Sequence, residues 1–90
     1  MAETRQFVML VGQLENVPQL RIGDDGQPHA IGTFVVRQGE DRWFRLLFFG
    51  GHAERIARIG KRGLWLDVHG WIINRLSKEI TVERFRVLTV

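Results

Sequence analysis

The residues with the clearest chemical potential lie in one apolar stretch, residues 42–49. Side chains of an extended strand alternate between two faces, so Trp43, Arg45 and Phe49 share one face. Aromatic rings offer surfaces on which nucleobases stack, at about 1–3 kcal/mol per base, and guanidinium groups form forked hydrogen bonds with phosphates. This face therefore predicts binding of a single-stranded nucleic acid. The alternative is that Trp43 and Phe49 pack in an interface or cover one end of the fold.

Cations lie in the predicted loops around this aromatic face. Arg37 and Arg42 flank one expected hairpin tip, and Arg75 and Lys78 flank a later turn. A cationic rim around aromatic rings suits a groove for a single strand, because the cations meet phosphates while the rings meet bases. Each charge taken alone is more often a solvated loop residue, so the prediction depends on the arrangement.

A second pair of aromatic residues lies in the stretch 64–73. Alternation places Trp65 and Trp71 on its outward face together with Asp67 and His69. Exposed apolar patches on a small protein tend to be interfaces, so contact between subunits is favoured over base stacking for both tryptophans. Asp67 and His69 are two residues apart on one face, which predicts a surface contact between them.

The elements that must position these side chains are mostly strands. Period-two patterns predict strands over 7–14 with a short continuation at 19–22, and then over 30–37, 42–49, 64–73 and 79–90; a helix is expected over 52–59. Five short strands with one helix between the third and the fourth indicate an all-β fold with one short helix. This pattern is typical of the five-stranded Greek-key barrel of the oligonucleotide/oligosaccharide-binding (OB) fold.

The composition narrows the function classes. Ninety residues predict a single domain, 1–90, with a flexible start at 1–5, and 44% hydrophobic residues argue against disorder. The sequence has no cysteine, HExxH motif or phosphate-binding loop, and its one serine, Ser77, has no triad motif around it. We therefore expect no enzyme, metal or cofactor. No apolar run is long enough for a membrane span and no secretory signal is present, so a cytoplasmic, nucleoid-associated protein is expected.

The positive charge is small but unevenly placed. Eleven arginines and two lysines oppose ten acids, for a net charge of +3. Residues 1–45 carry five basic and six acidic side chains, a net of −1, whereas residues 46–90 carry eight and four, a net of +4. The preference for arginine fits contact with phosphates and flat rings, although a GC-rich genome would also favour it.

The sequence resembles the bacterial single-stranded DNA-binding proteins over roughly residues 7–88. The resemblance is carried by residues 8–14 with Pro18 and Arg21, by residues 43–50, by Ala53-Glu54, by Lys61-Arg62-Gly63 and by Val68-His69-Gly70. It implies an OB barrel that forms a homotetramer or a homodimer and binds single-stranded DNA without sequence choice in replication, recombination or repair. Trp43, Arg45 and Phe49 fall on the family's positions for stacking and phosphate contact. The first strand would form the dimer edge, which here is Phe7, Val8, Met9 and Val11.

The sequence also departs from the family pattern. The family's stacking aromatics at the end of the second strand and in the last hairpin loop are replaced by residues 37–40 and 74–76. The linker and acidic tip with which family members recruit other proteins do not follow the barrel. In this respect the chain resembles primosomal replication protein N, a tailless relative, although a plasmid, phage or integrative-element protein would fit the same pattern. Two alternatives to a DNA binder therefore stay open: a primosome-type adaptor in replication restart, and a protein-interaction barrel without nucleic acid.

Overall fold

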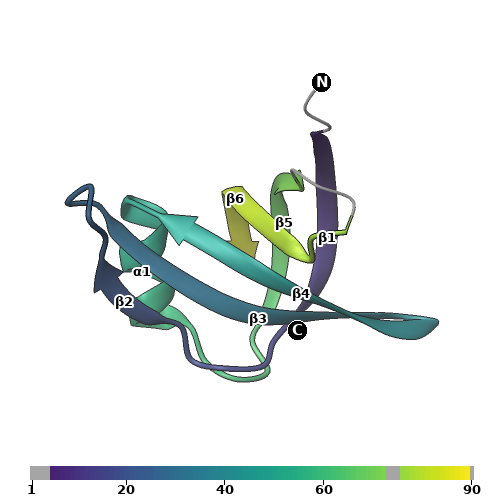
Figure 1. The fold of residues 1–90 in the computed structure, drawn as a ribbon. Helices are drawn as coiled ribbons and strands as arrows, with labels where there is room; N and C mark the ends of the chain where they lie inside the picture. Colours follow the sequence, from purple (N-terminus) through teal and green to yellow (C-terminus); the bar gives the residue numbers. More distant parts are fainter. Residues whose placement is uncertain (1–4, 73–75, 90) are drawn as a thin grey trace.

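The computed structural model describes residues 5–72 and 76–89. Figure 1 shows strands that curl around a core, with one helix beside them. The elements are β1 (Gln6–Leu14), β2 (Gln19–Ile22), β3 (Pro28–Gln38), β4 (Glu40–Phe49), α1 (Gly51–Ile59), β5 (Trp65–Ile72) and β6 (Glu79–Val87).

Five of these strands close into a barrel. The order β1-β5-β6-β4-β3 returns to β1 through a short pairing of Gln13–Leu14 with Phe34–Val35. β4 and β6 are parallel, whereas the other neighbours are antiparallel. The predicted class, an all-β fold with one short helix and a five-stranded OB barrel, is confirmed. β2 lies outside the barrel circuit, on the same edge of β3 that β1 uses farther along the chain.

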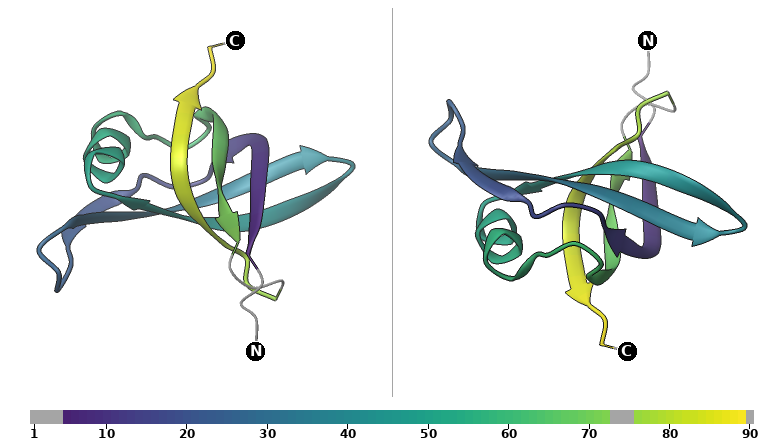
Figure 2. Two further views of the ribbon diagram at one scale, coloured as in Figure 1. Left: turned by 90° about the horizontal axis from the view of Figure 1, so that it is seen from above. Right: turned by 90° about the horizontal axis from the view of Figure 1, so that it is seen from below.

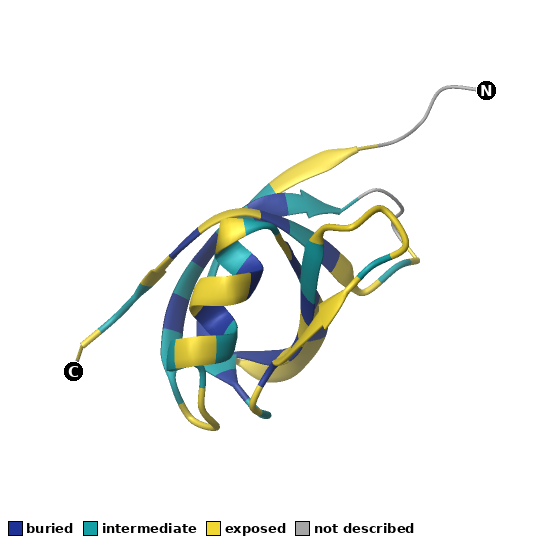
Figure 3. Ribbon diagram, turned by 90° about the vertical axis from the view of Figure 1, so that its left-hand side faces the viewer, coloured by how far each residue is buried: buried dark blue, intermediate teal, exposed yellow. Residues whose placement is uncertain are grey.

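The core follows from the alternation of each strand. Phe44, Leu46 and Phe48 of β4 point inward and are buried, while the residues between them are more exposed. The helix α1 adds Ala53 and Ile56, both fully buried, to the same cluster. Figure 3 shows this striped pattern of buried and exposed residues on the strands and on the helix. The outward faces are therefore available for binding.

A glycine permits the barrel to close. A Cβ atom at Gly12 would collide with the carbonyl oxygen of Val35 and press against the ring of Phe34. Gly12 pairs with Leu66 near the end of the β1–β5 pairing and directly precedes Gln13 and Leu14, which pair with β3. The absence of a side chain thus allows the two backbones to meet.

The β3–β4 hairpin extends beyond the barrel as an arm. Its two strands pair from His29–Phe49 to Gln38–Glu40, and the tip residue Gly39 has φ of 74°, a conformation that favours glycine. Figures 1 and 2 show the hairpin end projecting past the other strands. The arm carries Arg37 and Arg42 at its end, as the sequence predicts.

Element ends differ slightly from the predictions. The last strand stops at Val87. The Leu88 N–H still donates to the carbonyl of Trp65, which is the first residue of β5, so β5 offers no further partner beyond this point. The predicted end at Val90 lies outside the described residues. The predicted flexible start at 1–5, apart from Arg5, and the predicted site residue Arg75 lie outside the described residues. Within the described ranges, no helix has the length and apolar character needed to cross a membrane.

Candidate nucleic-acid interface

The outward face of β4 carries the predicted aromatic residues. Trp43 is 49% exposed and Phe49 is 41% exposed, whereas the inward ring of Phe48 is fully buried. Arg45 is also exposed and lies between them on the same face. The predicted split of this strand into a core face and an open face is confirmed. Phe49 follows Trp43 by six positions along the strand, which at about 3.3 Å per residue gives a span of about 20 Å.

Three of the predicted site residues surround one cavity. Trp43, Arg45 and Lys78 line a hollow of about 480 Å³ together with Thr33 and Glu79. The cavity forms because the segment before β6 runs beside β4, where the Arg45 N–H donates to the Lys78 carbonyl at 2.7 Å. A ring, a guanidinium and an ammonium group therefore border a space that a nucleotide could enter.

Two further cation contacts lie around Phe44. The Lys78 ammonium is 5.8 Å from the centre of the Phe44 ring, and the Arg42 guanidinium is 6.0 Å from it. Both distances are near the outer limit for a cation–π contact, so these cations are held loosely and remain exposed. Lys78 also lines the cavity beside Trp43, whereas Arg42 lies on the face of Phe44 and does not line it. A DNA contact by either cation stays a prediction.

Arg45 has a carboxylate neighbour that the sequence did not reveal. Its NH1 atom lies 3.4 Å from Oε2 of Glu79, and both side chains are exposed. The contact arises from the parallel pairing of β4 with β6, which sets Arg45 opposite Glu79. Such an exposed ion pair contributes about 0–1 kcal/mol, so phosphate can compete for the guanidinium.

Arg37 is bound more tightly by its own chain. Its guanidinium lies 2.6 Å from Asp41 and 2.9 Å from Glu15, and its Nε–H donates to the Gln13 side chain at 3.4 Å. A phosphate would have to displace two carboxylates from this group. A DNA contact by Arg37 stays a prediction, and the structure places Arg37 apart from the cavity beside Trp43.

Phe49, at the other end of the face, contacts a residue that sequence reasoning left out of the site. The rings of His29 and Phe49 meet edge to face with 4.7 Å between their centroids. His29 and Ile31 lie directly opposite Phe49 and Leu47 in the β3–β4 register. The strand predicted over 30–37 begins after His29, so alternation did not place this ring beside Phe49.

The turn before β3 holds His29 in place. Asp25 Oδ1 accepts a hydrogen bond from the Gln27 N–H at 2.9 Å and lies 3.4 Å from His29 Nε2. The hydrogen bond from Gln27 lowers the pKa of Asp25 below its ordinary value, and the neighbouring His29 lowers this pKa further. The His29 Nε2 atom is buried and has no hydrogen-bond partner of good geometry among the described residues.

The predicted oligomer interface lies on β1, two strands away from β4 in the order of the barrel. Phe7, Met9 and Val11 point outward along β1, and Met9 is 65% exposed. Val8 packs against the core, so only its backbone lies at the strand edge. Between Gln6 and Val11 the edge of β1 that faces away from β5 pairs with no described strand.

Both outward tryptophans of β5 are half-buried by their own chain. The indole N–H of Trp71 donates to the Glu83 carboxylate at 2.7 Å, and its ring meets Phe7 with 4.9 Å between centroids. The Arg5 guanidinium lies 4.8 Å from the same ring. These contacts hold Trp71 within one chain, and a subunit contact by Trp65 or Trp71 stays a prediction.

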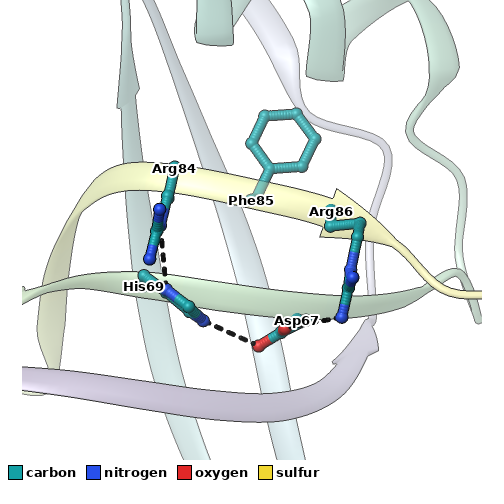
Figure 4. Close-up of a pocket in the computed structure, with 5 residues that line it drawn as sticks. All are labelled: Asp67, His69, Arg84, Phe85 and Arg86. Atoms are coloured by element: carbon teal, nitrogen blue, oxygen red, sulfur yellow. Dashed lines mark hydrogen bonds and ion pairs between the residues drawn. The ribbon is translucent and has the colours of Figure 1, made fainter.

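A row of polar side chains borders a smaller cavity of about 310 Å³ on this side. Figure 4 shows Arg84, His69, Asp67 and Arg86 in sequence across β6 and β5. Arg84 Nε–H donates to His69 Nδ1 at 3.0 Å, His69 Nε2 lies 3.2 Å from Asp67, and Asp67 lies 3.3 Å from Arg86. The predicted contact between Asp67 and His69 is confirmed.

The side chains that line this cavity are cationic, acidic or aromatic. Its lining contains no hydroxyl or thiol side chain that could act as a nucleophile. Among the described residues, no three histidine, cysteine, aspartate or glutamate side chains gather where they could hold a metal ion. Two arginines and one histidine lie around a single aspartate, so cationic groups are in excess in this row.

Comparisons with known proteins support the fold. No family model matches the sequence, and no curated protein matches it. The structure is similar to the SSB domain of a Synechococcus protein, with a TM-score of 0.79 and 20% identity over 96% of this chain and 98% of that chain. It is also similar to a deletion mutant of the single-stranded DNA binding protein from Thermus aquaticus, with a TM-score of 0.83 and 20% identity over 93% of this chain and 41% of that chain. The chain is thus an OB-fold protein whose barrel is built like that of the SSB domains.

Proposed function

We propose that this protein binds single-stranded DNA without sequence preference. The observation that carries the proposal is the half-exposed ring of Trp43, which shares one cavity with Arg45 and Lys78. A base can stack on this ring while the two cations meet the flanking phosphates. Stacking on an aromatic ring does not distinguish one base from another, which favours binding that tolerates any sequence.

The arrangement supports moderate rather than extreme affinity. Arg45 and Arg37 are both ion-paired, so part of the phosphate attraction is offset by the loss of these contacts. Residues 37–40 contain no aromatic side chain for a further stacking platform. We therefore expect binding that is strong at low salt and falls steeply as salt increases.

A titration with oligo-dT at two salt concentrations tests the proposal. Tryptophan fluorescence should be quenched on binding, and Trp43→Ala should weaken binding by about 1–3 kcal/mol while the circular dichroism spectrum is unchanged. Trp71→Phe serves as a control, because it changes an outward tryptophan on the other side of the barrel. Absence of binding at low salt would contradict the proposal.

We also propose that two copies associate through β1. The unpaired edge of β1 and the exposed side chains of Phe7, Met9 and Val11 support this, since open edges and apolar patches favour pairing with another chain. The partner is a second copy, giving a homodimer or, with further faces buried, a homotetramer. Size-exclusion chromatography with light scattering measures the state directly.

The cellular role that fits this activity is protection of exposed single strands in the cytoplasm during replication, recombination or repair. A replication-restart adaptor, as in the primosome, is the second candidate. The ion pairs of Arg37 and Arg45 favour this candidate, because the carboxylates weaken the attraction of both guanidinium groups for DNA phosphates. A dissociation constant for oligo-dT far weaker than micromolar at low salt would favour the adaptor.

A further inference from the structure

The largest described cavity lies outside the predicted site. It has a volume of about 810 Å³ and runs along β2 and the first half of β3. Val17 and Ile31 contribute exposed apolar surface to it, and Gln19, Arg21 and His29 contribute polar groups. The residues that line this groove are all different from those that line the cavity beside Trp43.

The groove continues the open face of β4. In the strand registers Phe49 lies opposite His29, and His29 lies opposite Arg21. One row farther along, Leu47 lies opposite Ile31, and Ile31 lies opposite Gln19. Directly paired residues share a face, so the surface passes without interruption from β4 over β3 to β2. The ring contact between Phe49 and His29 joins its two parts.

The chemistry of the lining suits nucleotides. The groove residues that the structure describes include no carboxylate. Arg21 makes no ion pair with any described residue, in contrast to Arg37 and Arg45. Aliphatic side chains provide flat contacts for bases, amide groups can bond to base edges, and a free guanidinium binds phosphate.

We propose that this groove is a second nucleotide-binding subsite, which extends the track of single-stranded DNA from Trp43 past Phe49 and across β3 to Arg21. The inference rests on the proposed DNA-binding function and adds a second contact site for the same strand. Neighbouring strands are about 4.8 Å apart, so the crossing from β4 to β2 adds about 10 Å to the span of about 20 Å along β4. A track of about 30 Å holds at most about nine nucleotides at the stacked spacing of 3.4 Å.

The first test compares two variants, each of which removes one positive charge. Arg21→Ala should reduce the slope of log K against log salt by about 0.7 for a dT oligonucleotide of about twelve residues, since one phosphate contact is lost. Arg58→Ala is the matched control, because Arg58 is exposed on α1, away from the groove lining. The control should leave the slope nearly unchanged.

A second pair of variants tests the apolar floor. Ile31→Asp should weaken binding of the same oligonucleotide about fivefold or more, the lower end of what one stacked base contributes. Leu20→Asp is its control, since Leu20 is 46% exposed against 50% for Ile31 but points to the other face of β2. Thermal unfolding of each variant verifies that the fold is retained.

A reporter in the groove separates this inference from the proposed function. The chain has no cysteine, so Val17→Cys accepts one environment-sensitive dye. The dye should respond to oligo-dT at the concentrations that quench Trp43, and Trp43→Ala should shift the dye response in parallel. If the dye does not respond and Arg21→Ala has the same salt slope as Arg58→Ala, the groove does not bind DNA. Quenching of Trp43 in that experiment would still support DNA binding by the protein. If the unaltered protein binds no oligonucleotide, both proposals fail.

Discussion

The Arg45 guanidinium lies 3.4 Å from the Glu79 carboxylate in the middle of the proposed binding face. The two residues are neighbours only because β4 and β6 run parallel. The carboxylate holds the guanidinium beside the cavity, and it also competes with any phosphate that arrives there. Glu79 is thus expected to limit the affinity for DNA.

Replacement of Glu79 should therefore strengthen binding. Glu79→Gln removes a negative charge next to the phosphate path and frees Arg45, so the dissociation constant for oligo-dT should decrease, most clearly at low salt. Stability should change by no more than about 1 kcal/mol, because the pair is exposed. Fluorescence titration at two salt concentrations measures the effect. Glu54→Gln, with the same charge change on α1, is the control and should not strengthen binding to the same degree.

If subunits associate through the exposed apolar edge of β1, a charge placed there should disrupt the assembly. Met9→Glu places a charge in the patch around Phe7 and Val11, so a dimer formed there should dissociate into monomers. Light scattering at several protein concentrations measures the change in mass. Leu20→Glu alters a comparably exposed apolar residue elsewhere and should leave the mass unchanged. An unaltered oligomer in the Met9 variant would show that another surface joins the subunits.

Barrel closure at Gly12 can be tested by adding one methyl group. Gly12→Ala forces a Cβ atom against the Val35 carbonyl and should lower the free energy of unfolding by about 1–3 kcal/mol, the usual cost of overpacking. Gly51→Ala is the matched control, because a Cβ atom there meets open space at the first residue of α1. It should leave stability unchanged or raise it by up to about 1 kcal/mol. Equal effects of both variants in urea unfolding would contradict the tight approach at Gly12.

The lowered pKa of the Asp25 carboxyl determines how this turn makes the folding stability depend on pH. A carboxyl group with a lower pKa in the folded state contributes stability above its unfolded pKa, near 3.8, and loses this contribution as the pH falls through the folded pKa. Asp25→Asn should therefore reduce the dependence of stability on pH only in the acidic window below about pH 4. A carbon-detected NMR titration of Asp25 gives the folded pKa directly. A midpoint above 3.8 would contradict the hydrogen bond from Gln27.

Much of the open face could be predicted from the sequence alone. Alternation along a strand is a local property, so it assigned Trp43, Arg45 and Phe49 to one side and Phe44, Leu46 and Phe48 to the other. Turn residues and glycines marked the ends of most elements to within a few residues. The resemblance to single-stranded DNA-binding proteins then predicted the barrel that the structure shows.

The partners of the charged residues could not be predicted in this way. Arg37 meets Glu15 across 22 positions of sequence, and Arg45 meets Glu79 across 34. Both contacts depend on the register between strands that are distant in the chain, and no local pattern encodes that register. The predictions therefore treated both arginines as free cations.

By itself, the amino-acid sequence determined which side chains lie on the inside and the outside of each strand, because the period of two follows from backbone geometry. Only the tertiary structure decided which of the outward residues meet. Barrel closure places β6 beside β4 and creates the cavity at Trp43, whereas β2 folds back on β3 across residues 23–27 and creates the groove at Arg21 beside the open face of β4. A binding surface of this kind is a non-local property, since it depends on the relative position of strands that only the closed barrel defines.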